Sequence, residues 1–331
     1  MEEVVACDLC GSTEHSFFLR SKDFVTKKEG LFSVVRCKEC GLIFTNPRPD
    51  KKEILNYYPD STPYDAFSES NLKPMNVITG KYKLLLKYFK GYFPEEPSTF
   101  YYKILMYPVY VLKKHKFYFN AVPDYVPDGT LLEIGSSYGK FLYSMKNLGW
   151  NVKGIEMSYE AVATCKKAYG LDLICQDIDS VSFASNTFDV IIMRMVLEHV
   201  FSPDKTIEKI NRWLKPGGQV LIVIPDISGF EARIFGKYFY GLMVPNHLYH
   251  FSPESITKYL SKHGLKVHAV RHHRTSRDFF QSIENALAEN PSVCWLKILR
   301  VFKVPVRLLL CVLSVVYRTG RMTVIAAKEK T

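Results

Sequence analysis

Four cysteines near the N-terminus have the spacing of a metal site. They form two pairs, Cys7-x-x-Cys10-Gly11 and Cys37-x-x-Cys40-Gly41, in which each glycine can relieve a tight turn. Two such pairs supply four thiolates to one tetrahedral zinc ion and leave no open position for water or substrate. We therefore predict a structural zinc ribbon over residues 1–49. A pair of redox dithiols or disulfides is the alternative for the same spacing.

A second stretch has the pattern of a cofactor-binding turn. The apolar run Leu131-Leu132 leads into Glu133-Ile-Gly135-Ser-Ser137-Tyr-Gly139, and a helical pattern follows over residues 140–148. The glycines permit a tight turn and a close approach of a ligand to the main chain. A second predicted strand ends in Glu156, about twenty residues further on, where a carboxylate can hold two ribose hydroxyls.

This combination resembles class I S-adenosylmethionine-dependent methyltransferases of the small-molecule branch. Three further segments match that family in the same order: Phe188 to Met193 is similar to its fourth strand, Val196 to Val200 to the segment after it, and Leu214-Lys-Pro-Gly-Gly218 to the turn before its fifth strand. Ser137 replaces the central glycine of the usual family motif. The resemblance covers about residues 129–272 and the last ten residues.

The resemblance implies a fold and a cofactor site. The fold is a Rossmann-like α/β sheet of seven mostly parallel strands in the order 3-2-1-4-5-7-6, with helices on both faces. Successive apolar runs separated by helical stretches predict such a parallel sheet independently. The implied cofactor is S-adenosylmethionine, and the positions that match the family's cofactor-binding residues are Glu133, Gly135, Ser137, Gly139, Glu156 and Asp177.

Three histidines are candidates for a general base. A sugar or aliphatic hydroxyl is a poor nucleophile until it loses its proton, and histidine titrates near neutral pH. His199 follows the predicted fourth strand, while His247 and His250 follow the fifth, in a stretch that resembles the family's histidine-rich substrate loop. The alternative role for His199 is to cap or pack a nearby helix, and at least one of the other two is expected to be structural.

The remaining segments are expected to be helical. Prolines divide residues 50–128, a lid or linker, into short helices; there Lys83, Lys87 and Lys90 share one face, which is either solvated or meets a substrate phosphate. Residues 129–275 form the methyltransferase core, residues 276–320 an apolar and basic insertion, and residues 321–331 the last core strand. The four other cysteines, Cys165, Cys175, Cys294 and Cys311, are expected to be reduced core thiols.

Charge and apolarity suggest the partners. The net charge is +11, with nine basic against three acidic residues in 72–127 and twelve against four in 265–331. This balance suits an acidic or lipid-linked acceptor, although it also suits nucleic acid. The apolar run 304–317 is shorter than the roughly 20 residues of a membrane-spanning helix. Residues 296–317 are therefore expected to lie on a membrane surface, to pack on the core or to form a homodimer contact.

These patterns favour a methyltransferase that acts on a hydroxyl of a sugar, a cell-surface glycan or a lipid-linked precursor. An RNA base methyltransferase with an N-terminal zinc module is one alternative, and a non-catalytic scaffold of the same fold is another. The acidic N-terminus, Met1-Glu2-Glu3, has no long apolar run, so we expect a cytosolic protein, either free or peripheral at the inner face of the membrane.

Overall fold

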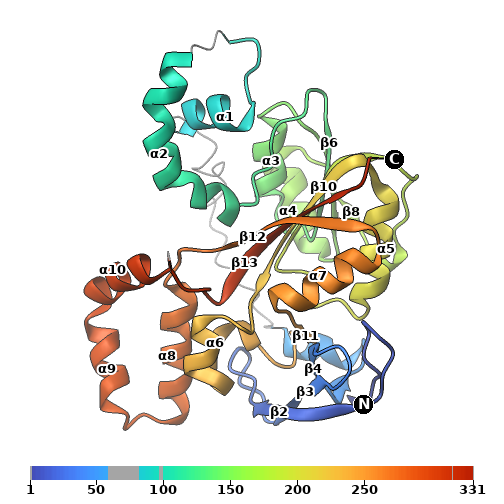
Figure 1. Ribbon diagram of the computed structural model, residues 1–331. Helices are drawn as coiled ribbons and strands as arrows, with labels where there is room; N and C mark the ends of the chain where they lie inside the picture. Colours follow the sequence, from blue (N-terminus) through green and yellow to red (C-terminus); the bar gives the residue numbers. More distant parts are fainter. Residues whose placement is uncertain (1, 59–81, 97–99, 315, 331) are drawn as a thin grey trace.

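The computed structural model describes residues 2–58, 82–96, 100–314 and 316–330. A seven-stranded sheet lies at its centre, in the order β8-β7-β6-β9-β10-β13-β12 (Figure 1). Counted along the core, this order is 3-2-1-4-5-7-6, and β13 alone runs antiparallel to its neighbours β10 and β12. The predicted sheet is thus confirmed. Its strands are β6 (Thr130–Ile134), β7 (Asn151–Glu156), β8 (Ile174–Cys175), β9 (Phe188–Arg194), β10 (Leu214–Pro225), β12 (Leu265–His272) and β13 (Arg321–Lys328).

Both faces of the sheet are covered, as expected for parallel strands that are apolar at almost every position. Leu132 and Ile191 face one buried cluster, and their neighbours Leu131 and Ile192 face another. The first cluster includes side chains of α5 and α7, and the second includes those of α1, α2, α3 and α4. These helices are α1 (Lys83–Lys90), α2 (Phe100–Phe119), α3 (Lys140–Lys146), α4 (Tyr159–Tyr169), α5 (Pro203–Trp213) and α7 (Pro253–Lys262).

The cysteine module forms a second sheet that is completed by a strand from the core. Its order is β11-β4-β3-β2, and β11 (Tyr249–His250) belongs to the segment after β10. In the antiparallel pairing of β11 with β4, Tyr249 lies opposite Phe44 and His250 opposite Ile43. The ribbon is therefore built into the segment that carries two of the candidate histidines. The other strands are β2 (His15–Ser21), β3 (Phe32–Cys37) and β4 (Ile43–Thr45), and β1 (Glu2–Glu3) pairs with β5 (Arg48–Pro49).

A half-buried carboxylate fastens the first cysteine pair to the core. Asp8 accepts hydrogen bonds from Ser202 Oγ (2.8 Å), from the Asp204 amide (2.8 Å) and from Tyr259 Oη (3.2 Å). Ser202 caps α5, and Tyr259 is fully buried on α7. Because hydrogen bonds to a charged group are about twice as strong as neutral ones, this contact holds the ribbon against two core helices.

The segment before the core differs from the sequence-based expectation in two ways. It contains η1 (Glu53–Tyr57), α1 and the 20-residue α2, which continues through Pro108 instead of breaking there. The carbonyl that Pro108 leaves without an intrahelical partner belongs to Ile104, which is exposed, so water can satisfy it. The prolines at 59, 63, 74 and 97 lie outside the described residues.

The lysine face of α1 is also different, because all three of its lysines are paired with carboxylates. Lys83 and Lys87 contact Glu96, at 2.5 and 3.4 Å, and Lys90 contacts Asp124 at 2.8 Å. The side chains of Lys87 and Lys90 are only 9% exposed. The prediction of a solvated face is therefore wrong for these two lysines. The charges of all three lysines, which could have met a substrate phosphate, are neutralised by the carboxylates of Glu96 and Asp124.

The predicted insertion is helical, but its cysteines are not in the core. It contains α8 (Arg277–Glu289), α9 (Cys294–Val301) and α10 (Lys303–Leu313), and α6 (Phe230–Phe235) packs against α8. Cys165 is buried, whereas Cys175, Cys294 and Cys311 are exposed. The expectation of core thiols fails for Cys294 and Cys311 because α9 and α10 leave much of their apolar surface uncovered, and it fails for Cys175 because β8 is an edge strand of the sheet. Among the helices of the described residues, none combines the length and apolarity that crossing a membrane requires.

Candidate active site

The glycine turn after β6 is closed onto the neighbouring strand β7. The amides of Gly135 and Ser136 both donate to the carbonyl of Ile155, at 2.9 and 3.0 Å. The next amide, that of Ser137, donates to Glu156 Oε2 at 2.7 Å, and the Ser158 amide donates to Glu156 Oε1 at 2.9 Å. The Glu156 carboxylate is thus held between the turn and the start of α4, at the carboxyl end of β7.

The two glycines of the turn are required by packing as well as by backbone conformation. Gly135 has φ +74° and Gly139 has φ +71°. A Cβ on Gly135 would lie 2.3 Å from Val196 Cγ2, and one on Gly139 would lie 2.1 Å from Cys165 Sγ. Ser137, at the position of the missing third glycine, also has a left-handed φ of +49°. Serine therefore carries a conformational cost there that glycine would not.

Glu133, near the end of β6, is a buried carboxylate of which only one oxygen is hydrogen-bonded within the described residues. Its Oε1 accepts from Arg194 Nε (2.9 Å) and Nη2 (2.7 Å), while Oε2 has no hydrogen-bond partner in the described part of the chain. Burial raises the pKa of Glu133 to about 7, and the charge of Arg194 opposes this shift. An unpaired buried acceptor is costly, so this oxygen suits a donor brought by a ligand.

Asp177 follows β8, as the sequence predicts, and is exposed. Its Oδ1 accepts from the Asp179 amide at 3.0 Å and caps the short helix η5 (Ile178–Ser180). Glu133, Glu156 and Asp177 therefore each stand at the carboxyl end of one of three adjacent parallel strands, which is the side on which such sheets bind ligands.

Two of the three candidate histidines lie side by side. The rings of His199 and His247 meet edge to face, with centroids 4.6 Å apart. His199 Nδ1 lies 3.0 Å from the carbonyl of Asn246, and His247 Nδ1 lies 2.8 Å from the carbonyl of Gly241. Because a carbonyl only accepts, each ring must carry its proton on Nδ1, which leaves the lone pair on Nε2. Burial lowers the pKa of both rings, so both are neutral near pH 7.

Glu198 lies directly behind these rings. It is fully buried, and neither of its carboxyl oxygens has a hydrogen-bond partner among the described residues. Oε1 is 4.0 Å from His247 Nε2, and burial raises the pKa of Glu198 to about 8. Its backbone carbonyl accepts from the amides of Leu248 and Tyr249, which ties the end of β9 to the histidine segment. Tyr58 Oη lies 3.3 Å from His199 Nδ1 at the outer side of the group.

His250 is placed apart from this pair. It is buried in β11, its Nε2 is 3.3 Å from Thr45 Oγ1, and burial lowers its pKa to about 3. Thr45 Oγ1 also donates to the carbonyl of His247 at 3.0 Å. One threonine of the ribbon thus contacts both parts of the histidine segment. The sequence contained no signal for Thr45 or for Arg194, because each acts on a residue more than 60 positions away.

The four N-terminal cysteines converge. Cys7 Sγ is 3.4 Å from Cys40 Sγ and Cys10 Sγ is 3.6 Å from Cys37 Sγ, and all four sulfurs lie within 4.8 Å of one another. These separations are far longer than a disulfide bond of about 2.05 Å. They are close to the roughly 3.8 Å edge of a tetrahedron with metal–sulfur bonds of about 2.3 Å. The cluster is therefore compatible with a tetrahedral metal ion.

Parts of the chain are similar in sequence to known proteins. Residues 111–270 match a family described as a methyltransferase domain. An uncharacterized protein of Methanocaldococcus jannaschii is 31% identical over 35% of this chain, and the match spans about half (54%) of that protein's length. A ubiquinone biosynthesis O-methyltransferase of Paraburkholderia phymatum is 26% identical over 45% of this chain and 71% of its own length.

Solved structures of low sequence identity are also similar. An S-adenosylmethionine-dependent methyltransferase from Mesorhizobium loti has a TM-score of 0.44 at 16% identity, covering 61% of this chain and 92% of its own. One from Methanosarcina mazei has a TM-score of 0.45 at 15% identity, covering 62% of this chain and 95% of its own.

The packing of the turn leads to a test by a double-mutant cycle. Gly139→Ala should reduce the free energy of unfolding by roughly 3 kcal/mol, from the contact with Cys165 Sγ together with the left-handed backbone. In a Cys165→Ala background the same change should cost only about 1–2 kcal/mol, because only the backbone cost remains. Urea unfolding of the four proteins measures both values. Equal costs in the two backgrounds would contradict the packing argument.

Proposed function

Because residues 111–270 match a methyltransferase domain family, we propose that this protein is an S-adenosylmethionine-dependent enzyme that methylates a hydroxyl oxygen of a small molecule. The observation that carries the proposal is the Glu156 carboxylate, held by the Ser137 amide against the glycine turn at the carboxyl end of the sheet. The ubiquinone biosynthesis relatives, whose names state an O-methyl transfer, support oxygen as the acceptor atom. A sugar, a glycan or a lipid-linked precursor is the proposed class of acceptor.

The proposed cofactor contacts follow from the strand ends. Glu156 would accept from the ribose hydroxyls and Asp177 from the adenine amino group, while the unpaired Oε2 of Glu133 would accept from the amino group of the methionine part. Gly135, Ser137 and Gly139 would form the turn against which the cofactor packs. When bound, the cofactor supplies an electrophilic methyl group on a sulfonium sulfur.

His199 is the proposed general base. Its proton is fixed on Nδ1 by the Asn246 carbonyl, so Nε2 can take the proton of the acceptor hydroxyl. The new bond between oxygen and the methyl carbon makes that proton strongly acidic, so a base with a lowered pKa is sufficient. His247 and Glu198 would position the His199 ring, and His250, through Thr45, would position the segment that carries His247.

The four-cysteine cluster is proposed to hold a structural zinc ion, since all four thiolates point to one centre. Through β4, the metal would hold β11 and the histidine segment in place. Loss of the metal would then disturb the histidines that are proposed to face the methyl acceptor, and it would leave the residues proposed to bind the cofactor in place.

Cofactor binding is tested first by calorimetry. The wild-type protein should bind S-adenosylmethionine with micromolar affinity, and Glu156→Gln should weaken this binding at least tenfold, because a charged acceptor of the ribose hydroxyls is lost. Asp172→Asn, which changes an exposed carboxylate after α4, is the matched control and should bind as the wild type does. Failure of the folded wild type to bind would favour the non-catalytic scaffold.

The role of His199 is tested by transfer of a radiolabelled methyl group to a panel of catechols, nucleotide sugars, glycolipids and RNA. His199→Ala should lower kcat by roughly 10²–10⁴-fold and leave the affinity for S-adenosylmethionine unchanged. Added imidazole should restore part of the rate, which loss of a merely structural histidine would not allow. Activity on RNA alone, with a steep dependence on salt, would replace the small-molecule proposal.

Metal analysis tests whether the four-cysteine cluster binds zinc. The wild-type protein should contain about one zinc ion per chain, and Cys10→Ser/Cys40→Ser should contain almost none. Cys175→Ser, which removes an exposed cysteine outside the cluster, should keep the metal. The zinc-free variant should lose methyl transfer but keep its affinity for S-adenosylmethionine. An unchanged zinc content in the double variant would show that the metal is held elsewhere.

A further inference from the structure

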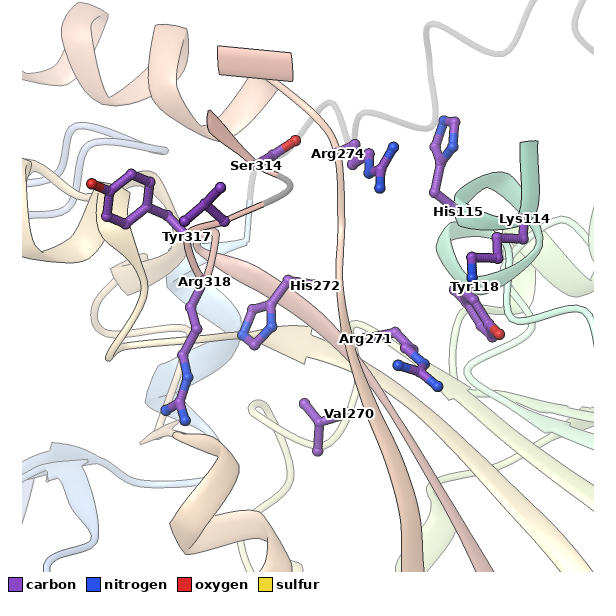
Figure 2. Close-up of a pocket in the computed structure, with 11 residues that line it drawn as sticks. Lys114, His115, Tyr118, Val270, Arg271, His272, Arg274, Ser314, Tyr317 and Arg318 are labelled. Carbon is purple, nitrogen blue, oxygen red and sulfur yellow. The ribbon is translucent and has the colours of Figure 1, made fainter. Parts of the chain in front are cut away.

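A basic pocket of about 330 Å³ lies at the edge strand β12, away from the glycine turn. Figure 2 shows its walls: Lys114, His115 and Tyr118 of α2 on one side, Ser314, Tyr317 and Arg318 on the other, and the end of β12 between them. Among the described residues, four permanent cations and no carboxylate line it. They are Lys114, Arg271, Arg274 and Arg318.

These cations are largely available to a ligand. Arg318 contacts the exposed Glu254 at 2.9 Å, and Arg271 stacks on the Tyr118 ring at 5.5 Å. Lys114 and Arg274 have no carboxylate partner in the described part of the chain. The charge of Arg274 also contributes, after burial, to lowering the pKa of His115. The pocket therefore has a positive potential that only an anion can relieve.

The surface beside the pocket is apolar on both sides. On α2, Leu112 is 66% exposed; on α10, Leu308 and Val312 are 67% and 68% exposed. Figure 1 shows α10 and most of α2 standing clear of the central sheet, which the end of α2 approaches. A soluble anion would contact only the cationic side chains and would leave the apolar side chains beside the pocket uncovered. A cationic pocket between two uncovered apolar helices matches a molecule that carries a phosphate on an apolar chain.

We propose that this face binds anionic phospholipid at a membrane surface. The lipid phosphate enters the pocket between Arg271, Arg274 and Lys114, and the exposed apolar side chains of α2 and α10 enter the acyl region. Such helices lie in the plane of the interface and do not cross the membrane. The proposal does not depend on methyl transfer.

Co-sedimentation with vesicles tests the proposal on the full-length protein. The wild-type chain should bind vesicles of phosphatidylglycerol and phosphatidylcholine much more tightly than vesicles of phosphatidylcholine alone. Arg271→Gln/Arg274→Gln should weaken this binding by roughly 30-fold, at about fivefold for each cation near an anionic surface. The charge-matched control, Lys205→Gln/Lys266→Gln, changes exposed lysines outside the pocket and should bind within about twofold of the wild type.

A second pair of variants tests the apolar part. Leu308→Gln/Val312→Gln should also lose most of the vesicle binding, whereas the equally exposed control pair Val4→Gln/Leu31→Gln should keep it. Affinity for S-adenosylmethionine, measured on every variant, reports folding and keeps a failure of this proposal separate from a failure of the proposed enzyme.

Three results would overturn the proposal. Equal losses in the charge-matched control would indicate a response to net charge alone. Full displacement by inorganic diphosphate at constant ionic strength, with no effect of Leu308→Gln/Val312→Gln, would assign the pocket to a soluble phosphate. Absence of vesicle binding, together with a wild-type dimer that Leu308→Gln/Val312→Gln dissociates in sedimentation velocity, would assign the apolar face to a second copy of the chain.

Discussion

The short antiparallel pair of β4 and β11 is the contact on which the position of the histidine segment, residues 247–250, depends. It joins the cysteine ribbon to the segment that brings His247 against His199. Two backbone pairs are weak by themselves. They are supported by Thr45, which bonds the carbonyl of His247, and by Asp8, which fastens the ribbon to α5 and α7. The ribbon is therefore a structural part of the candidate site, although its cysteines are more than 150 positions from the candidate histidines in the sequence.

Much of the fold follows from local sequence patterns. Each core strand is an apolar run with a turn signal at its end, so the runs beginning at Leu131, Val152 and Phe188 could be recognised, and the family resemblance supplied their order. The strand β11 could not be recognised. It has two residues, and it exists only because β4, about 200 positions earlier, offers an edge to pair with.

The candidate site also contains residues that the sequence could predict and contacts that it could not. The acidic residues at strand ends were predictable because a strand end fixes where its next side chain lies. Their role in binding a cofactor stays a prediction. The partners of Glu133 and His199 were not predictable, since Arg194 and Asn246 reach them across the fold. The lysines of α1 show the same limit: Glu96 and Asp124, which lie in a separate segment, decide that those charges are neutralised.

The glycine turn also has a consequence for how such sequences diverge. A side chain at Gly135 would collide with Val196, and one at Gly139 would collide with Cys165. Both collisions are with the protein itself and would occur without any ligand. A descendant that no longer used the cofactor would still need both glycines in order to fold. Retention of these two positions among diverged copies would then record the architecture of the turn. Drift at Glu156, whose carboxylate accepts from two backbone amides among the described residues, would be the earlier sign that binding had been lost.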